Sequence, residues 1–310
     1  MPSTTELLSS TPDGETEDDS PVQMMSFNSA DPTGAGGLAA DLVASSSCGG
    51  HVLPITTGIL IRDSTTTFEW VEIDADAVEE QARSVLEDMD VDVIKVGFVG
   101  SPESLAMVAE ITADYEEIPV ITQATPLSWW ERDKIESYLD ALTELILPQT
   151  SVLVGNFDTL WRWLLPDWTS QKRPSPRDIA AAAAQHGVPY VVITSANVTV
   201  ESLDTVVATP EAVLATITLD RYEANFMGAG DTFSSALATL LATGEELVDA
   251  VREASIYVNR SLLAAFQPGM GAALPDRMFW AQVADEEGDE VDAPGSDDDL
   301  LGMPPNTTRH

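Results

Sequence analysis

The sequence contains very few basic residues and a single cysteine. Only 14 lysines and arginines stand against 52 aspartates and glutamates, so the net charge is −38 over 310 residues. A surface of this sign repels nucleic acids and anionic membranes, and neither is an expected partner. Because Cys48 is alone, a disulfide within the chain and a cysteine zinc cluster are both excluded. A lone cysteine fits a reducing compartment, and we expect a cytoplasmic protein.

Long apolar runs are also missing. A membrane-spanning helix needs about 18 consecutive apolar residues, and no such stretch occurs. The amino-terminal residues are polar and acidic, without the basic and apolar segments of a secretory signal, so we expect no export by that route. Hydrophobic residues nonetheless make up 44% of the chain, which is enough to build a core.

The acidic residues are dense at both ends and also spread between them. Residues 1–22 contain six acids and residues 285–299 contain nine, with no basic residue in either stretch. We therefore predict a disordered acidic tail at 1–21, one folded domain at 22–284 and a second disordered acidic tail at 285–310. Because the excess also runs through the folded part, adaptation to a salty cytoplasm is favoured. The alternative is an acidic surface that binds a basic partner.

Strand and helix patterns alternate along the predicted domain. Runs rich in apolar and β-branched residues predict strands, and apolar residues at helical spacing predict helices. Strands are predicted at 22–27, 52–61, 91–99, 118–122, 151–154 and 190–194, with edge strands within 206–218. Helices are predicted at 38–43, 75–89, 102–115, 130–146, 178–186 and 247–266, and directly after Asp231. This alternation predicts an α/β fold, a three-layer α/β/α sandwich with a mainly parallel central sheet.

A glycine turn opens one of the predicted helices. Gly228, Ala229 and Gly230 precede Asp231, and an apolar helix pattern begins at once. The backbone N–H groups at such a helix start favour an anion. Asp231 is well placed there to take a proton from a hydroxyl beside that anion. The pattern indicates a phosphoryl-transfer centre; the alternative is that Asp231 only caps the helix and the glycines only form a turn.

Four segments, in this order and spacing, resemble the ribokinase-like small-molecule kinases. The similarity is greatest to the hydroxymethylpyrimidine and hydroxymethylpyrimidine-phosphate kinases of thiamine biosynthesis. The segments are 31–42, which begins Asp-Pro-Thr-Gly, then 51–57, 94–97 and 228–233. The resemblance implies transfer of phosphate from ATP, with Mg²⁺, to the hydroxymethyl group of a small heterocycle. The amides of residues 228–231 would form the anion hole and Asp231 would be the base.

The resemblance also implies roles for single residues on the substrate side. It assigns substrate binding to Asp31, Gly34, Gly37, Asp41 and Arg62. Arg62 stands where these pyrimidine kinases carry glutamine. Because arginine only donates hydrogen bonds and prefers a carboxylate or a phosphate, a changed or phosphorylated substrate is expected. The alternative is that Arg62 pairs at the surface with Asp63 or Asp41.

The nucleotide side departs further from the family pattern. The usual Asp-Pro-Val is replaced by residues 123–125, and the usual Gly-Gly turn by residues 195–197. These changes leave open an alternative function, that of a catalytically weak or inactive ligand-binding or regulatory relative of these kinases. Asp231 stands where the pyrimidine kinases usually carry cysteine, so a sugar or nucleoside kinase is a further alternative. The oligomeric state stays open, with a homodimer as one option. The expected nucleotide ligands are Asn156, Thr194 and Asn197, and the expected metal ligand is Asp158.

Overall fold

The computed structural model describes residues 20–281. The tails predicted at 1–21 and 285–310 lie outside this range, apart from residues 20 and 21. The described residues up to Phe279 belong to one compact unit, and Trp280 and Ala281 belong to a second. Within residues 20–281, no helix has both the length and the apolar composition required to cross a membrane.

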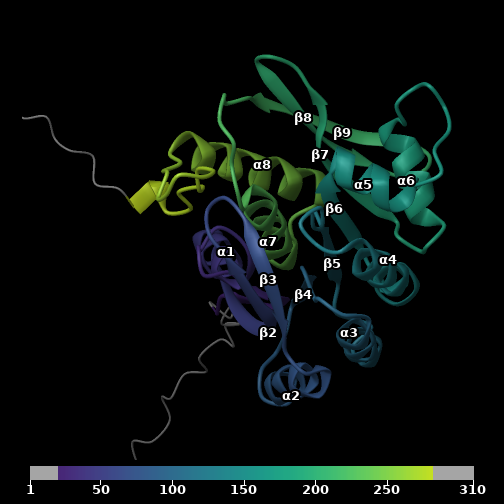
Figure 1. Ribbon diagram of the computed structural model, residues 1–310, viewed down its shortest axis with the longest axis vertical. Helices are drawn as coiled ribbons and strands as arrows, with labels where there is room; N and C mark the ends of the chain where they lie inside the picture. Colours follow the sequence, from purple (N-terminus) through teal and green to yellow (C-terminus); the bar gives the residue numbers. More distant parts are fainter. Residues whose placement is uncertain (1–19, 282–310) are drawn as a thin grey trace, which may run out of the picture. The chain divides into compact units, whose positions relative to one another are not determined.

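One nine-stranded sheet forms the centre of the fold (Figure 1). Its strand order is β3-β2-β1-β4-β5-β6-β7-β8-β9. From β2 to β7 the neighbouring strands are parallel, while β3, β8 and β9 are antiparallel to their neighbours. The predicted mainly parallel sheet is therefore confirmed. The strands are β1 (Val22–Ala30), β2 (Gly50–Arg62), β3 (Thr67–Glu72), β4 (Val93–Val96), β5 (Val120–Ala124), β6 (Val152–Asn156), β7 (Tyr190–Val198), β8 (Ser202–Ala208) and β9 (Val213–Asp220).

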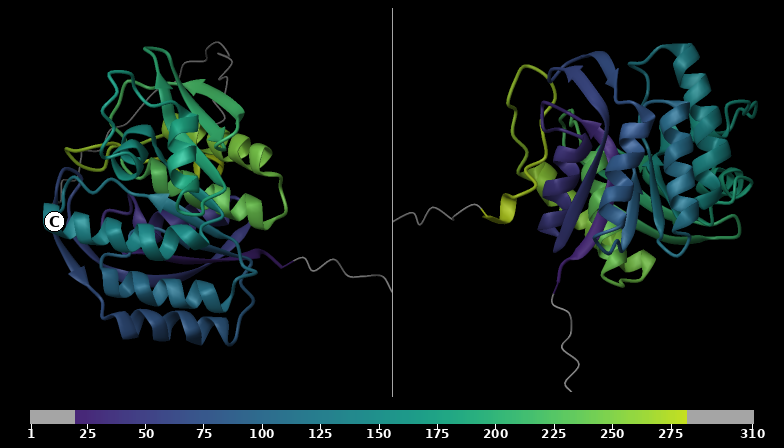
Figure 2. Two further views of the ribbon diagram at one scale, coloured as in Figure 1. Left: turned by 90° about the vertical axis from the view of Figure 1, so that its right-hand side faces the viewer. Right: turned by 90° about the horizontal axis from the view of Figure 1, so that it is seen from below.

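Helices cover both faces of the sheet, which confirms the predicted three layers (Figures 1 and 2). On one face lie α1 (Gly37–Ser47), α7 (Ala229–Ala242) and α8 (Leu247–Leu263). On the other face lie α2 (Ala75–Leu86), α3 (Pro102–Asp114), α4 (Arg132–Ala141), α5 (Phe157–Leu164) and α6 (Pro176–Ala184). Three further helical segments are short: η1 (Leu142–Ile146) is a π-helical turn, and η2 (Leu147–Gln149) and η3 (Phe279–Ala281) are 3₁₀-helical turns.

The strand side chains alternate between two apolar cores. In β4, Ile94 and Val96 pack on the side of α2 to α6, whereas Val93 packs on the side of α7 and α8. In β7, Val191 and Val192 divide in the same way. Successive strand residues point to opposite faces, so a strand covered on both sides is apolar along its whole length. Polar side chains therefore gather where the strands end.

One strand and one α-helix were not predicted from the sequence. The strand β3 is a short edge strand whose side chains are intermediate or exposed, so its burial supplies little pattern. The helix α5 has eight residues and follows β6 directly, with the Asn156 side chain as its cap. A helix of this length makes only about two turns, which is too short for a helical period to be recognised in the sequence. The predicted helix at 130–146 is α4 followed by a π-helical turn, η1.

Candidate functional site

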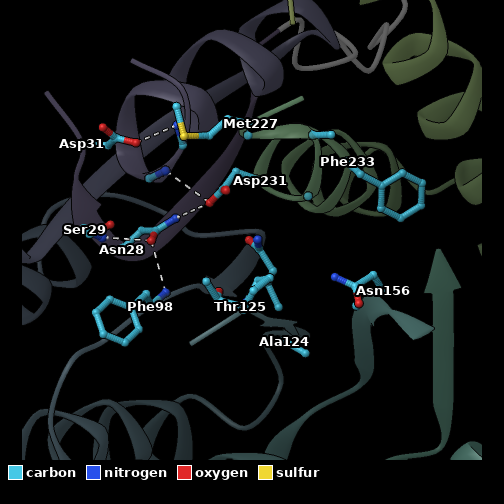
Figure 3. Close-up of a pocket in the computed structure, with 18 of the residues that line it drawn as sticks. Asn28, Ser29, Asp31, Phe98, Ala124, Thr125, Asn156, Met227, Asp231 and Phe233 are labelled. Atoms are coloured by element: carbon cyan, nitrogen blue, oxygen red, sulfur yellow. Dashed lines mark hydrogen bonds between the residues drawn. The ribbon is translucent and has the colours of Figure 1, made fainter. Parts of the chain in front are cut away.

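A pocket of about 520 Å³ opens at the carboxyl ends of the parallel strands. The ends of β1, β4, β5, β6 and β7 all contribute residues to its lining, as do the loops before α1 and α7 (Figure 3). The strand β1 lies between β2 and β4, so the order of the chain reverses beside it. In parallel α/β sheets, ligands bind in the crevice at such a reversal. The topology alone therefore places a ligand here.

Asp231 faces Asn28 across this pocket (Figure 3). The Nδ2 atom of Asn28 lies 3.3 Å from Oδ1 of Asp231, and the N–H group of Gly37 donates to the same oxygen at 3.2 Å. A Cβ atom placed on Gly36 would lie 3.0 Å from Oδ2 of Asp231 and 3.6 Å from Oδ2 of Asp31. The two glycine loops, residues 31–37 and 228–231, therefore form one wall of the pocket, and the carboxylates of Asp31 and Asp231 both lie near Gly36.

The surroundings of Asp231 make it a better proton acceptor than an exposed aspartate. Burial raises the pKa of the Asp231 carboxyl, and the nearby charge of Asp41 acts in the same direction. The charges of Lys95 and Arg277, with the hydrogen bond from Asn28, lower this pKa without reversing the rise. A carboxylate with a raised pKa suits the role of a general base.

A buried ion pair lies behind the Asn28 side chain. The Nζ atom of Lys95 lies 2.8 Å from Oδ1 of Asp41, and both side chains are fully buried. Ser235 donates to the same oxygen at 2.5 Å, while Ser26 and Asn28 donate to Oδ2 at 2.6 and 2.9 Å. The structure thus places Asp41 outside the pocket lining, where it orients Asn28 instead of facing the cavity.

Replacing Lys95 with methionine is expected to destabilise the protein by about 3–5 kcal/mol, because the Asp41 carboxylate would stay buried without its counter-charge. Denaturant unfolding at neutral pH measures this difference. The matched control is Arg132→Met, since the Arg132–Glu136 pair is exposed and should contribute less than about 1 kcal/mol. Equal losses in the two variants would mean that the buried pair has no special role in stability.

Asp31 organises the first glycine loop. Its Oδ1 atom accepts hydrogen bonds from the N–H and hydroxyl groups of Thr33 at 2.9 and 2.7 Å. Its Oδ2 atom accepts from the N–H group of Gly36 at 3.1 Å and lies 3.5 Å from Nη1 of Arg62. Asp31, Gly37 and Arg62, three of the predicted substrate-binding residues, therefore lie together at the pocket. Gly34 lies in the same loop, outside the pocket lining.

Arg62 lines the pocket, with its side chain 17% exposed. The alternative was that Arg62 pairs with Asp63 or Asp41, but the structure pairs its guanidinium with the carboxylate of Asp31. The Nε atom donates to the backbone oxygen of Asp63 at 3.4 Å, and Asp41 is paired with Lys95. The guanidinium also contacts the sulfur of Met227. An arginine beside a cavity favours an anionic group on the ligand.

Gly228 opens α7 in the left-handed conformation, with φ at 84°. No side chain among residues 20–281 caps this helix start. The first N–H groups of a helix have no partner within it, so those of residues 229–231 remain beside the pocket that they line. A Cβ atom on Gly228 would lie only 1.6 Å from the carbonyl oxygen of Ala35. The two glycine loops therefore touch at a point where only glycine fits.

The predicted nucleotide-binding residues are divided between two places. Asn156 and Thr194 line the pocket. The next residue, Ser195, also lines it and has a φ of 53°, a left-handed conformation that favours glycine. Asn197 is exposed, donates to Asp204 at 3.2 Å and lies outside the lining.

Asp158 also lies outside the pocket lining, in the first turn of α5. Its carboxylate is exposed and lies 3.3 Å from Arg173, whose guanidinium lies 3.6 Å from the ring centre of Phe157. Among residues 20–281, no group of three or more His, Cys, Asp or Glu side chains is arranged to hold a metal. The carboxylates in the pocket lining are those of Asp31 and Asp231. Mg²⁺ that is bound mainly by substrate phosphates needs only one or two carboxylates, so this donor set fits it.

Polar groups also come from the end of β5, where residues 123–125 replace the usual Asp-Pro-Val of the family. Gln123 is buried, and its Oε1 atom accepts a hydrogen bond from Ser234 at 2.8 Å. The buried hydroxyl of Thr125 lines the pocket and has no hydrogen-bond partner among residues 20–281. Buried polar groups are normally satisfied, so a ligand or a bound water would have to supply the partner of this hydroxyl.

Aromatic side chains form a further wall. Phe98, at the end of β4, packs edge-on against Trp70, Trp129 and Trp130 with ring centres 4.7 to 5.5 Å apart. Phe98 and Trp129 line the pocket. Together they offer an apolar surface to a flat ring. Sequence reasoning missed Phe98, and the adjacent Trp129 and Trp130 were the available signal.

The arrangement of the fold and the site defines a class of protein. Pyridoxal kinase from Bacillus subtilis in complex with ADP superimposes with a TM-score of 0.73 at 19% identity, covering 84% of this chain and 99% of that one. Phosphomethylpyrimidine kinase from Clostridium difficile 630 gives a TM-score of 0.62 at 18% identity, covering 78% and 99%. The fold is that of the ribokinase-like small-molecule kinases.

The sequence comparisons define the family. Residues 31–276 match the family model for phosphomethylpyrimidine kinase. The hydroxymethylpyrimidine/phosphomethylpyrimidine kinase of Streptomyces coelicolor is 27% identical over 262 residues, which cover 84% of this chain and 96% of the relative. The kinase of the same name from Mycobacterium tuberculosis is 25% identical, covering 81% and 92%. The chain therefore belongs to the phosphomethylpyrimidine kinase family, and the resemblance inferred from four sequence segments is confirmed. It is a phosphotransferase of the hydroxymethylpyrimidine kinase type.

Proposed function

We propose that this protein transfers the γ-phosphoryl group of ATP to the hydroxymethyl group of hydroxymethylpyrimidine, or to the phosphate group of hydroxymethylpyrimidine phosphate. The observation that carries the proposal is the meeting of both glycine loops at one carboxylate, that of Asp231, in one pocket. Family membership supports the substrate class. Structures of the pyridoxal kinase from Staphylococcus aureus with ADP and with AMP-PCP, which share this fold, support ATP as the phosphoryl donor.

In the proposed reaction the acceptor hydroxyl lies beside Asp231, which accepts its proton while the oxygen attacks the γ-phosphorus. The bond between that phosphorus and the bridging oxygen of ATP breaks, and ADP leaves. The N–H groups of residues 229–231 stabilise the negative charge on the phosphoryl oxygens during transfer. Mg²⁺ held mainly by the ATP phosphates would neutralise part of their charge. Because Asp231 serves as the base, Asp31 is the pocket carboxylate that would help to hold the ion.

Turnover with a substrate panel tests the proposal. The protein is incubated with ATP, Mg²⁺ and either hydroxymethylpyrimidine, its phosphate, pyridoxal, a nucleoside or ribose, and ADP is measured. We expect ADP to form fastest with one of the two pyrimidines. If the pyrimidines raise the melting temperature but no ADP forms with any acceptor, the protein is the ligand-binding relative instead. A preference for ribose or a nucleoside would identify the other kinase alternative.

The pH dependence of kcat follows from the environment of Asp231. Burial raises the pKa of this carboxyl, so the base loses its proton at a higher pH than an exposed aspartate, for which the pKa is about 3.9. We expect the acid limb of the kcat profile above that value, with the rate falling about tenfold per pH unit below the limb. A profile that stays flat down to the pKa of an exposed aspartate would contradict a raised pKa at the base.

We also propose that the acidic composition is an adaptation to a salty cytoplasm. The net charge of −38 supports this, because dissolved salt screens the repulsion between carboxylates. Turnover should therefore be assayed in molar potassium chloride. Assembly as a homodimer is a further proposal, and light scattering in the same buffer measures it.

A further inference from the structure

Arg277 lies one residue beyond the segment that matches the family model, and it is not part of the pocket lining. Arg277 is nevertheless buried, with only 7% of its surface exposed. Its backbone oxygen accepts hydrogen bonds from Ser47 of α1 at 3.0 Å and from Tyr257 of α8 at 2.9 Å. Two helices thus anchor Arg277 so that its guanidinium reaches between the two glycine loops.

On one side, this guanidinium binds the first glycine loop from behind. Nη1 donates to the carbonyl oxygen of Gly34 at 3.1 Å, and Nη2 donates to that of Ala35. The peptide bond is planar and trans, so the N–H group of Gly36 points away from the Ala35 carbonyl. That N–H group donates to Asp31 at 3.1 Å. By holding the carbonyl, Arg277 therefore fixes the direction of the amide on the pocket side.

On the other side, the same guanidinium binds the start of α7. Its Nε atom donates to the hydroxyl of Thr232 at 2.9 Å, and this hydroxyl donates to the carbonyl oxygen of Gly228 at 2.8 Å. A Cβ atom on Gly228 would lie 2.8 Å from Nη2 of Arg277. The Arg277 side chain is therefore hydrogen-bonded directly to the first glycine loop and, through Thr232, to Gly228 at the start of α7. Only the planar fork of arginine supplies donors in these three directions at once.

The positive charge of Arg277 also acts on Asp231. Burial raises the pKa of Asp231, and Asp41 from α1 acts in the same direction, whereas Lys95 from β4 and Arg277 oppose the rise. Without Arg277, Lys95 would be the remaining cation among these groups that favours the ionised carboxylate. The titratable groups that act on the guanidinium itself are Asp231, Tyr257, Asp41 and Asp31.

We infer that Arg277 is a positioning residue that holds the two glycine loops, and with them Asp231, in the geometry that phosphoryl transfer requires. The inference rests on the proposed function. Arg277 acts through the loops without lining the pocket, so its loss should affect the rate of the chemical step more than the binding of the pyrimidine.

Two variants separate the bonds of Arg277 from its charge. Arg277→Met removes both the bonds and the charge. We expect its kcat to fall about 100-fold, because a displacement of about 1 Å at the reacting groups has an effect of this size. The change in KM should be smaller. The acid limb of kcat should move to higher pH, because losing a nearby positive charge favours protonated Asp231. Arg277→Lys keeps the charge, so its acid limb should stay near that of the wild type while kcat stays reduced.

The matched control is Arg252→Met, an exposed arginine of α8 paired with Asp249, which should leave both kcat and the acid limb unchanged. A folded Arg277→Met protein with the kcat and acid limb of the wild type would overturn the inference. If that variant does not fold, Arg277→Lys decides, and an unchanged kcat in it would overturn the inference equally. Absence of turnover in the wild type would instead overturn the proposed function, so the two failures are distinguishable.

Discussion

Asp231→Asn is expected to lower kcat by about 10²- to 10⁴-fold, because the amide keeps the shape of the carboxylate but cannot accept the proton of the acceptor hydroxyl. Affinity for ATP and for the pyrimidine should change little. Steady-state kinetics with hydroxymethylpyrimidine as the acceptor measures the loss. Phosphorylation at the wild-type rate would remove Asp231 from the role of base.

The same variant should not lose stability. Burial raises the pKa of Asp231, so the folded protein holds this proton more tightly than the unfolded chain does. At neutral pH the ionised carboxylate therefore disfavours folding, and this effect vanishes as the pH falls below the unfolded pKa of about 3.9. We expect the melting temperature of Asp231→Asn at neutral pH to equal or exceed that of the wild type. The matched control is Asp249→Asn, which changes an exposed acid in the first turn of α8 and should leave kcat unchanged.

Gly228→Ala is expected to destabilise the protein by about 3 kcal/mol or more and to lower kcat by about 100-fold. The added Cβ atom would lie 1.6 Å from the carbonyl oxygen of Ala35, so the two glycine loops must separate. Because the N–H groups of residues 229–231 and the Asp231 carboxylate follow directly, both move with the loop. Denaturant unfolding and steady-state kinetics measure the two losses.

Gly244→Ala provides the control for backbone conformation alone. Gly244 follows α7, directly after its C-cap Thr243, with a φ of 90°, close to the 84° of Gly228. A Cβ atom on Gly244 would meet nothing within 4 Å among the described residues. Its cost should be the left-handed penalty of about 1–2 kcal/mol, with kcat unchanged. If Gly228→Ala were no worse than Gly244→Ala, the close approach of the loops would not matter.

Much of the fold could be predicted because the responsible signals are local. Apolar strands such as 190–194 and amphipathic helices such as 75–89 show their period within a few residues. The second glycine loop could also be found locally, since Gly-Ala-Gly-Asp directly precedes a helix pattern. The parallel topology brings the strand ends to one edge of the sheet, which is why the two loops meet there in the structure.

The parts that could not be predicted depend on contacts across long stretches of chain. Asn28 is an unremarkable polar residue in its strand until β1 lies beside Asp231, 203 residues away. Arg277 lies 243 residues from Gly34, whose carbonyl it binds. Asp41 was predicted to bind substrate because its segment resembles the family loop. No signal in that segment shows that Asp41 instead pairs with Lys95, outside the pocket lining. Side chains that satisfy distant backbone groups leave no periodic signal in the sequence.

The most direct measurement is to follow the labelled phosphoryl group itself. The protein is incubated with hydroxymethylpyrimidine or its phosphate and with ATP carrying ¹⁸O in the non-bridging γ-phosphoryl oxygens, and the product is analysed by mass spectrometry. The proposed function predicts a labelled phosphate ester of hydroxymethylpyrimidine, or a labelled diphosphate when its phosphate is the acceptor, with one product molecule for each ADP formed. Labelled inorganic phosphate with unmodified pyrimidine, or no ADP at all, would contradict it.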